Sequence, residues 1–444
     1  MARSDAFSRD RIRGAPLRAL TRLGGSELAA LLHLRRPIER AVYHATRAGA
    51  RAVAARTPLG KSASGGEPRR LDPPKTPGLF DLTPTEEQAI VRDTMRRFAD
   101  EVLRPAARGA DDAASPPAEV LAQAHALGLA GLAMPESLGG AATERSSVTN
   151  ALIAEELARG DMGLATAVLA PLGVVHAIVA WGTGDQQERH LPAFLGERFL
   201  PAALALLEPH LLFDPMRPRT GAVRSPSGGW ALWGEKSLVP LAATAQLFLI
   251  AAEVQGAGPR LFIVERDTPG LTIEPEPAMG LRPAALGRLR LEDARVEEDA
   301  LVGGQQTAFD LGVLVDRARI AWGALAVGTA QAVLDHVIPY CNERQAFGEP
   351  ISNRQSVAFL VADIAIEVEG MRLLVQRAAS RADRGADLDR DASLVRLQCA
   401  SKGVKIGSDG VQLLGGHGFV KEHPVERWYR DLRAIGVVEG ALLV

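Results

Sequence analysis

The spacing of apolar residues changes twice along this chain, which predicts three successive parts. From about residue 80, apolar residues recur every three or four positions, as they do on the buried face of a helix. Between residues 200 and 302, short apolar runs are separated by Gly, Pro and Asp, which is typical of strands joined by turns. Helical spacing returns from about residue 307. This order predicts an α+β protein with an N-terminal α-helical domain (80–199), a middle antiparallel β domain (200–302) and a C-terminal helical bundle (303–444).

The helical domain opens with a helix start signal and contains the longest apolar run. Thr83 and Glu86 predict a capping box, with Pro84 at the first helical position. Helical spacing follows at Ile90, Val91, Met95, Phe98, Val102 and Leu103, and again over 118–127 and 148–158. Residues 164–181 are almost wholly apolar but include Pro171, so we expect a pair of buried helices there rather than a membrane span.

The middle and C-terminal parts differ in the spacing of their apolar residues: the middle part has short apolar runs, and the C-terminal part has one long helical stripe. Strands are expected at Trp230–Trp233, Gln246–Val254, Arg260–Glu265 and Arg288–Leu291. The stripe consists of Val357, Leu360, Val361, Ile364, Val368 and Met371. Three or four helices of this length fit between residue 307 and the end, which is enough for a bundle.

Charge is distributed unevenly along the chain. Residues 1–75 hold 16 Lys/Arg against 6 Asp/Glu, whereas the remainder holds 35 against 47. A stretch rich in Gly, Ser and Pro (62–77) follows, so we interpret residues 1–79 as a basic N-terminal extension and linker. Such an extension can pack on a partner, lie on a membrane surface, target the chain to an organelle, or remain a solvated arm. The sequence leaves these alternatives open.

The overall composition narrows the class of protein. With 47% hydrophobic and 23% charged residues, the chain has the composition of a soluble globular protein. A net charge of −2 gives no support for nucleic-acid binding. The chain has two cysteines, Cys341 and Cys399, which argues against a disulfide framework and for a reducing compartment. Neither has a Cys or His neighbour at metal-ligand spacing. We therefore expect a cytoplasmic protein.

One carboxylate stands out near the C-terminal end of the sequence. Glu439 lies in an otherwise apolar run that includes Val437, Val438 and Leu442. Burial penalises the charged form of a carboxyl group, which is one way in which proteins make a general base. The alternative is a solvated Glu at a frayed end of the chain.

Other candidate residues each have two interpretations. The three glycines in Gln412–Gly418 would let backbone N–H groups approach a phosphate, or they simply end a helix. Arg344 suits a pyrophosphate, or lies solvated at a helix end. Asp316 and Arg319, three residues apart, are candidates for a helix-surface ion pair. His417 and His423 lack a third ligand nearby in sequence, so we predict no metal site.

The order and spacing of these segments resemble the acyl-CoA dehydrogenase family over about residues 80–444. The segments that carry the resemblance are Asp316–Arg319, Arg344–Ile351, Gln355, Gln412–Phe419, Pro424–Asp431 and Val438–Gly440, with support from Met279–Arg282 and Leu291–Val296. The resemblance implies an α domain, a β domain and a four-helix bundle, assembled into homodimers or homotetramers. It also implies FAD between the β domain and the bundle, an acyl-CoA substrate, and an electron-transfer flavoprotein as electron acceptor.

The resemblance also implies roles for individual residues. Position by position, FAD contacts fall on Arg344, Phe347, Gln355, Gln412, Gly415 and Gly416, acyl-CoA contacts on Asp316 and Arg319, and the catalytic base on Glu439. Glu439 would remove the acyl α-proton while the β-hydride passes to flavin N5. Some members place the base just before the arginine that matches Arg319, but Ala318 stands there.

The β-domain motifs depart from the family pattern. Leu207, Phe213, Leu238 and Pro240 stand where members have hydroxyl-bearing residues or the Trp that covers the flavin. These differences keep two alternatives open beside an enzyme. One is a non-catalytic partner subunit of a mixed, hetero-oligomeric dehydrogenase assembly, and the other is a binding or scaffold protein that retains the fold.

Overall fold

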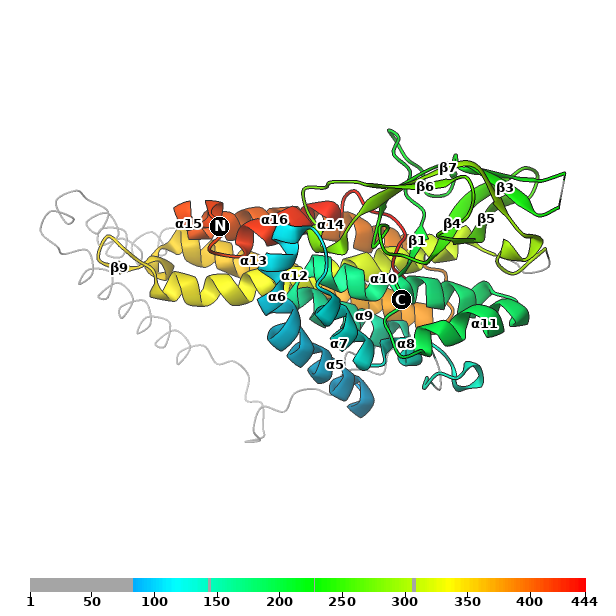
Figure 1. Cartoon of the computed structure of the whole chain (residues 1–444). Coiled ribbons are helices and arrows are strands. Elements are labelled where there is room, and N and C mark those ends of the chain that lie inside the picture. Colours follow the sequence, from blue (N-terminus) through cyan, green and yellow to red (C-terminus); the bar gives the residue numbers. More distant parts are fainter. Residues whose placement is uncertain (1–82, 143–144, 227, 306–308) are drawn as a thin grey trace, which may run out of the picture. The chain divides into compact units, whose positions relative to one another are not determined.

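The computed structural model describes residues 83–142, 145–226, 228–305 and 309–444. The predictions for the basic extension (1–79) lie outside the described residues. Within the described ranges the predicted order of helices, strands and helices is confirmed (Figure 1). The domain limits at 199/200 and 302/303 stay predictions, and they bracket a strand region that begins at Ala202 and a bundle that begins at Leu311.

The cap of the first described helix lies two residues later than predicted. Thr85, not Thr83, caps the first helix: its hydroxyl accepts from the Gln88 N–H at 3.2 Å, and the Gln88 side chain accepts from the Thr85 N–H at 3.0 Å. An amide oxygen completes the capping box as well as the Glu86 carboxylate would, so Pro84 lies before the cap. The elements of this part are α5 (Glu86–Phe98), η1 (Ala99–Leu103), α6 (Arg104–Ala113), α7 (Ala118–Ala126), α8 (Leu129–Leu132), η2 (Glu136–Leu138), α9 (Ser147–Gly160), α10 (Met162–Trp181), α11 (Gly184–His190) and η3 (Leu191–Leu195).

A single helix, α10, occupies the region where a pair of helices was expected. It runs unbroken through Pro171 and is capped by Asp161, whose carboxylate accepts from the Leu164 N–H at 2.9 Å. By length and apolar composition it could cross a membrane, but 89% of its apolar 18-residue stretch is buried inside the fold. Packing on all sides outweighs the hydrogen bond that Pro171 removes, so the proline does not end the helix.

The middle part forms a seven-stranded sheet in the order β1-β4-β2-β3-β7-β6, with β5 on the other edge of β4. Its strands are β1 (Ala202–Ala205), β2 (Gly221–Arg224), β3 (Trp230–Val239), β4 (Leu247–Val254), β5 (Gly258–Glu265), β6 (Leu271–Pro275) and β7 (Gly287–Val296). The pairs β2·β3, β3·β7, β4·β5 and β6·β7 are antiparallel, as expected. Strands β1 and β2 instead run parallel to β4, so the sheet is mixed rather than purely antiparallel.

The C-terminal part is the predicted helical bundle, in which α12, α13 and α14 lie lengthwise beside one another (Figure 1). Its elements are α12 (Leu311–Glu343), β8 (Gln345–Ala346), β9 (Glu349–Pro350), η6 (Ile351–Asn353), α13 (Gln355–Asp383), α14 (Asp389–Leu414), α15 (Gly416–Phe419) and α16 (Val425–Ala434). The predicted stripe on α13 faces inward: Ile364, Val368 and Met371 are fully buried.

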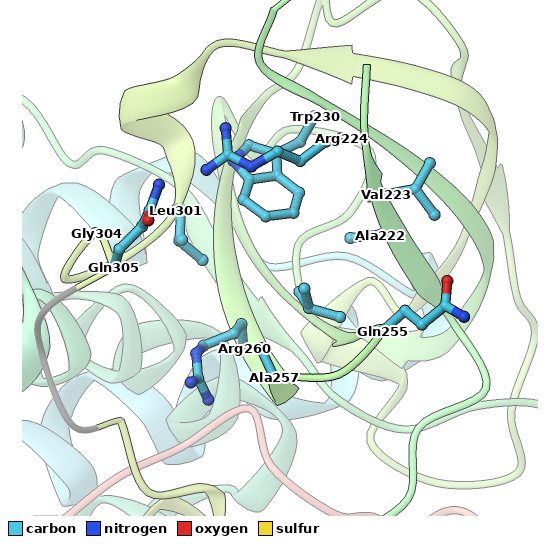
Figure 2. A pocket seen from close by; sticks show the side chains of 11 residues that line it. Ala222, Val223, Arg224, Trp230, Gln255, Ala257, Arg260, Leu301, Gly304 and Gln305 are labelled. Carbon is cyan, nitrogen blue, oxygen red and sulfur yellow. The ribbon is translucent and has the colours of Figure 1, made fainter. Parts of the chain in front are cut away.

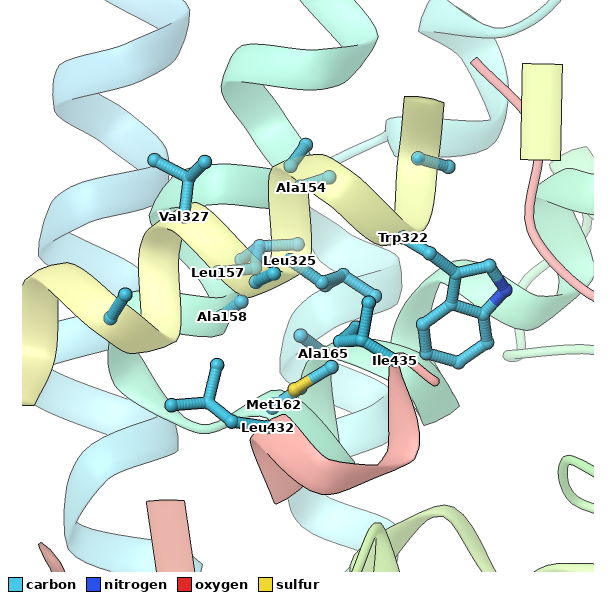
Figure 3. Close-up of a cluster of buried hydrophobic side chains, with 14 of the residues drawn as sticks. Ala154, Leu157, Ala158, Met162, Ala165, Trp322, Leu325, Val327, Leu432 and Ile435 are labelled. Carbon is cyan, nitrogen blue, oxygen red and sulfur yellow. The ribbon is translucent and has the colours of Figure 1, made fainter. Parts of the chain in front are cut away.

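One apolar core joins the bundle to the N-terminal helices. Figure 3 shows Leu157 from α9, Met162 from α10, Leu325 from α12 and Leu432 from α16 meeting in this core. Small residues allow the helices to approach closely, since a β-carbon at Gly328 of α12 would lie under 3.0 Å from the backbone of α9. Trp322 and Ile435 lie in the same cluster (Figure 3), so the core also fixes the segment that follows α16.

Candidate active site

Glu439 lies in the segment that follows α16, and its side chain is only 8% exposed. Two arginines face its carboxylate. Arg319 of α12 places Nη2 at 3.3 Å from Oε1 and Nε at 3.4 Å from Oε2. Arg396 of α14 places Nη2 at 3.3 Å from Oε1. The solvated alternative for Glu439 is therefore wrong, because the core fixes this segment and two helices supply buried partners.

Asp316 lies close to this pair but does not form the predicted surface ion pair. Among the described residues, Arg319 directs its guanidinium to Glu439, and no ion pair joins it to Asp316 within 4.0 Å. Asp316 is 9% exposed. Burial, opposed by the charge of Arg319, raises the pKa of Asp316 to about 6. A buried carboxyl that titrates near neutral pH thus lies one helical turn before the arginine that holds Glu439.

The backbone around Glu439 is held by contacts that local sequence patterns did not predict. Trp322 Nε1 donates to the Gly440 carbonyl at 2.8 Å. Gly440 has φ +71°, and a β-carbon there would lie 2.6 Å from the Leu206 side chain, so this turn requires glycine. Arg396 Nη1 donates to the Val438 carbonyl at 2.6 Å and also to the Ile435 carbonyl. Trp322 and Arg396 sit in the middle of long helices, where no motif marks them.

The residues matched to FAD contacts gather at the other end of the bundle. Arg344 directly follows α12, and Phe347 forms the tip of the β8–β9 hairpin with φ +57° and 95% exposure. Gln355, Gln412, Gly415 and Gly416 are also exposed. The Tyr340 hydroxyl lies 2.9 Å from His417 Nδ1 and 3.3 Å from the Leu414 carbonyl, which ties the end of α12 to the glycine loop.

This cluster does not meet Glu439 within one chain. A helix rises about 1.5 Å per residue, so the 25 positions from Arg319 to Arg344 along α12 correspond to about 37 Å. The structure therefore brings Arg319 to Glu439, and Arg344 close to the Gln412–Gly416 loop, as two separate groups. A site that used both groups would need a second copy of the chain.

A small apolar pocket lies beside the Glu439 segment. Its volume is about 220 Å³, and its walls include Leu238, Met279, Val437 and Val438. Arg430 and Arg433 also line the pocket, and its apolar walls fit the flat face of a ring system. The polar contacts differ, because Leu207, Phe213 and Pro240 carry no suitable hydroxyl.

The nearby donors on β3 already have a partner. Glu276 accepts from the Leu238 N–H at 2.7 Å and from the Ser237 hydroxyl at 2.9 Å, and it pairs with Arg288. A flavin in this pocket would therefore have apolar contacts with Leu238, Val437 and Val438, while the Leu238 N–H is already bonded to Glu276.

A second pocket of about 480 Å³ lies in the β domain, away from the predicted site residues. Figure 2 shows its lining, in which Arg224 stacks over Trp230 at 4.6 Å from the ring centre and Arg260 contributes a further cation. None of the predicted site residues lines this pocket.

His417 and His423, the two histidines considered as metal ligands, have hydrogen-bonding neighbours. His423 Nδ1 lies 3.2 Å from His336 Nε2, and His417 Nδ1 contacts the Tyr340 hydroxyl. In the described part of the chain, no group of three or more His, Cys, Asp or Glu residues is arranged to hold a metal ion.

Comparison with known proteins covers all three parts of the chain. Models of the N-terminal, middle and C-terminal domains of acyl-CoA dehydrogenases match residues 85–198, 203–294 and 313–442. An acyl-CoA dehydrogenase of Bacillus subtilis is 32% identical over 364 residues, which cover 80% of this chain and 95% of the relative.

Solved structures give the same result. Butyryl-CoA dehydrogenase from Megasphaera elsdenii superposes with a TM-score of 0.75 at 27% identity, covering 81% of this chain and 96% of that one. The FAD complex of PigA superposes with a TM-score of 0.73 at 26% identity and the same coverage. The chain therefore belongs to the acyl-CoA dehydrogenase family, whose members are oxidoreductases that act on CH–CH bonds.

Proposed function

We propose that this protein is a flavin-dependent acyl-CoA dehydrogenase that forms an α,β-double bond in an acyl-CoA thioester. The observation that carries this proposal is the buried carboxylate of Glu439, held by Arg319 and Arg396 beside the apolar pocket at Val438. A buried, oriented carboxylate is suited to remove a carbon-bound proton, because it is partly freed from water and already pointed at its target.

In the proposed mechanism, the Glu439 carboxylate takes the α-proton. The electrons of the broken α C–H bond form the new double bond, and the β-hydrogen leaves with the electrons of its own C–H bond. When bound, FAD supplies the acceptor for the β-hydride at N5. The backbone N–H of Glu439 donates to the thioester carbonyl and stabilises the negative charge that develops there. Arg319 orients the base before the substrate binds, because its Nη2 and Nε lie 3.3 and 3.4 Å from the two carboxylate oxygens.

The acyl-CoA substrate is proposed to contact Asp316 and Arg319. Both residues lie on α12, one helical turn apart, so a thioester placed against this turn would meet the base and its partner together. The buried carboxyl of Asp316 offers a hydrogen bond to the polar part of the substrate.

A homo-oligomer is proposed to complete the cofactor site. The predicted FAD contacts Arg344, Phe347 and Gln412 lie about 37 Å along α12 from the base in the same chain. In a symmetric dimer, the exposed end of one bundle would reach the pocket of its partner. Exposed apolar side chains on the bundle, such as Phe359 and Ile366, support burial against another copy.

Two further proposals concern the electron acceptor and the cellular location. An electron-transfer flavoprotein is the proposed electron acceptor. A cytoplasmic location is proposed because both cysteines are unpaired and buried, as expected for a reducing compartment.

A second candidate function is a partner subunit that does not itself bind flavin. The observation that favours it is Glu276, which occupies the Leu238 N–H and the Ser237 hydroxyl beside the pocket. Such a chain would keep its oligomer contacts and support the active site of a related subunit.

One experiment separates these two functions. The full chain is purified alone and its visible spectrum is recorded before and after anaerobic addition of acyl-CoA esters of increasing chain length. The proposal predicts a yellow protein whose visible flavin absorbance is bleached by at least one ester. A colourless protein that gains activity only with a co-expressed homologue would support the partner subunit instead.

A further inference from the structure

We propose that Arg396 of helix α14 is a positioning residue that sets the direction in which Glu439 presents its carboxylate. The inference rests on the proposed function, in which Glu439 is the base. It assigns a role to a residue in the middle of α14, at some distance in sequence from every segment that carries the family resemblance.

One guanidinium group makes three contacts with the segment that bears the base. Nη2 of Arg396 lies 3.3 Å from Glu439 Oε1. Nη1 donates to the Val438 carbonyl at 2.6 Å and to the Ile435 carbonyl. Because the guanidinium is planar and its donors are fixed relative to one another, these contacts hold the carboxylate at a set angle to its own backbone.

Arg396 reaches this position from a buried helix face. Ala392 and Cys399, one turn before and after it, and the adjacent Val395 are fully buried, and the Arg396 side chain itself is 19% exposed. Burying a guanidinium costs free energy unless it is fully paired. Its three contacts with the Glu439 segment offset part of that cost.

Arg319 differs from Arg396 in what it holds. It contacts both carboxylate oxygens of Glu439, at 3.3 and 3.4 Å. Arg396 adds contacts to the backbone carbonyls on the N-terminal side of Glu439. Oε1 therefore faces two guanidinium groups, whereas Oε2 has one contact at 3.4 Å. This asymmetry leaves Oε2 as the oxygen that takes the α-proton.

The test compares Arg396→Met with Arg396→Lys and with a control on the same helix. Methionine keeps most of the side-chain length but removes the charge and all donors. Lysine keeps the charge but not the planar arrangement. The control is Lys402→Met, because Lys402 also lies on α14 and pairs with Glu367, away from Glu439.

The main readout is exchange of the substrate α-proton with deuterium in D2O, under anaerobic conditions without an external electron acceptor. It reports proton removal separately from reoxidation. We expect Arg396→Met to slow exchange by about 100-fold, since a small misplacement of a catalytic group costs about that much. We expect Arg396→Lys to slow exchange by about tenfold, because lysine keeps the charge but loses the planar contacts, and Lys402→Met to equal wild type.

Two further measurements distinguish positioning from general damage. Acyl-CoA affinity and flavin content should both be unchanged in Arg396→Met, although exchange of the α-proton is slowed. The same two quantities should be unchanged in Arg396→Lys, with a smaller loss of exchange rate. If Arg396→Met does not fold, the lysine variant alone decides, because normal exchange in it would overturn the role of the planar contacts.

Failure of this inference and failure of the proposed function give different results. If Arg396→Met exchanges within about twofold of wild type, while Glu439→Gln exchanges nothing, only the role of Arg396 is wrong. If Glu439→Gln exchanges normally, the proposed base itself is wrong.

Discussion

Gly173 on helix α10 packs directly against the backbone carbonyl of Ala441, two residues after the proposed base. A β-carbon at position 173 would lie under 3.0 Å from that oxygen, closer than real β-carbons come to such an atom. The glycine therefore allows the apolar helix α10 to pack closely against the segment that carries Glu439. Any side chain at position 173 must push that segment away from α10.

Gly173→Ala should accordingly impair catalysis more than binding. Overpacking at a buried contact costs about 1–3 kcal/mol, and here the strain is relieved by moving the Glu439 segment. We expect kcat to fall by tenfold or more, with a smaller change in KM, in steady-state assays with an acyl-CoA ester. The control is Gly184→Ala at the start of α11, where a β-carbon meets nothing within 4 Å. Equal kinetics for Gly173→Ala and wild type would show that this contact does not position the base.

Trp322→Phe tests the hydrogen bond to Gly440. The variant keeps an aromatic ring in the core but loses the Nε1 donor that contacts the Gly440 carbonyl at 2.8 Å. Leaving that buried carbonyl without this donor should reduce the free energy of unfolding by about 1–2 kcal/mol. Urea unfolding measures the change, and Trp233→Phe, at a residue 41% exposed, is the matched control. A larger loss in the control would contradict this account of the core.

Asp431 makes stability depend on pH in an unusual direction. Burial, together with the nearby Asp161 carboxylate, raises the pKa of Asp431 to about 8, whereas a carboxyl in the unfolded chain titrates at about 3.9. Between about pH 4 and 8 the native state thus binds more protons than the unfolded state. Stability from this group is fully present below that window and is lost as the pH rises through it.

Asp431→Asn should remove this dependence. The amide oxygen can still accept from the Leu281 N–H, which lies 2.7 Å from Asp431 Oδ1. We compare the free energy of unfolding of the variant with that of wild type. We expect this difference to favour the variant by about 1–3 kcal/mol more at pH 8 than at pH 5. Thermal unfolding at the two pH values measures the gain, with Asp363→Asn on the exposed face of α13 as control. A variant that loses stability equally at both values would contradict the protonated state of Asp431.

Subunit mixing tests whether the exposed end of the bundle serves a neighbouring active site. Arg344→Glu should abolish flavin binding in its partner's site, and Glu439→Gln should abolish catalysis in its own. If each site takes its base from one chain and Arg344 from the other, random dimers of the two inactive variants recover about one quarter of wild-type activity. No recovery in verified mixed dimers would place both residues in the same site.

The order of the three parts could be predicted because the repeat of apolar residues is a local signal. Ile364, Val368 and Met371 recur with helical spacing and do face the core of the bundle. The continuity of α10 was not predictable from the same signal, since Pro171 and Gly173 usually interrupt helices and only tertiary packing shows that they do not here. The capping box was predicted two residues too early for a similar reason. Thr83 and Thr85 offer equivalent local signals, and the rest of the fold selects between them.

The site was predicted only where a residue lies in a recognisable segment. Glu439 and Arg319 stand in such segments, and the structure brings them together. Arg396 and Trp322 could not be found in this way, because long-range contacts between helices decide their role. Strands β1 and β2 were missed because four residues are too few to show alternation.

The most direct test of the central claim is rapid-mixing absorbance of the purified, flavin-loaded protein with an acyl-CoA ester that bleaches the wild type. Wild-type protein should lose flavin absorbance in a single anaerobic turnover. Glu439→Gln should keep its flavin, bind the ester with similar affinity and show no bleaching, because an amide cannot accept the α-proton. The control, Glu422→Gln at an exposed position before α16, should behave as wild type. Bleaching of the Glu439→Gln variant at a rate near that of wild type would contradict the assignment of Glu439 as the base.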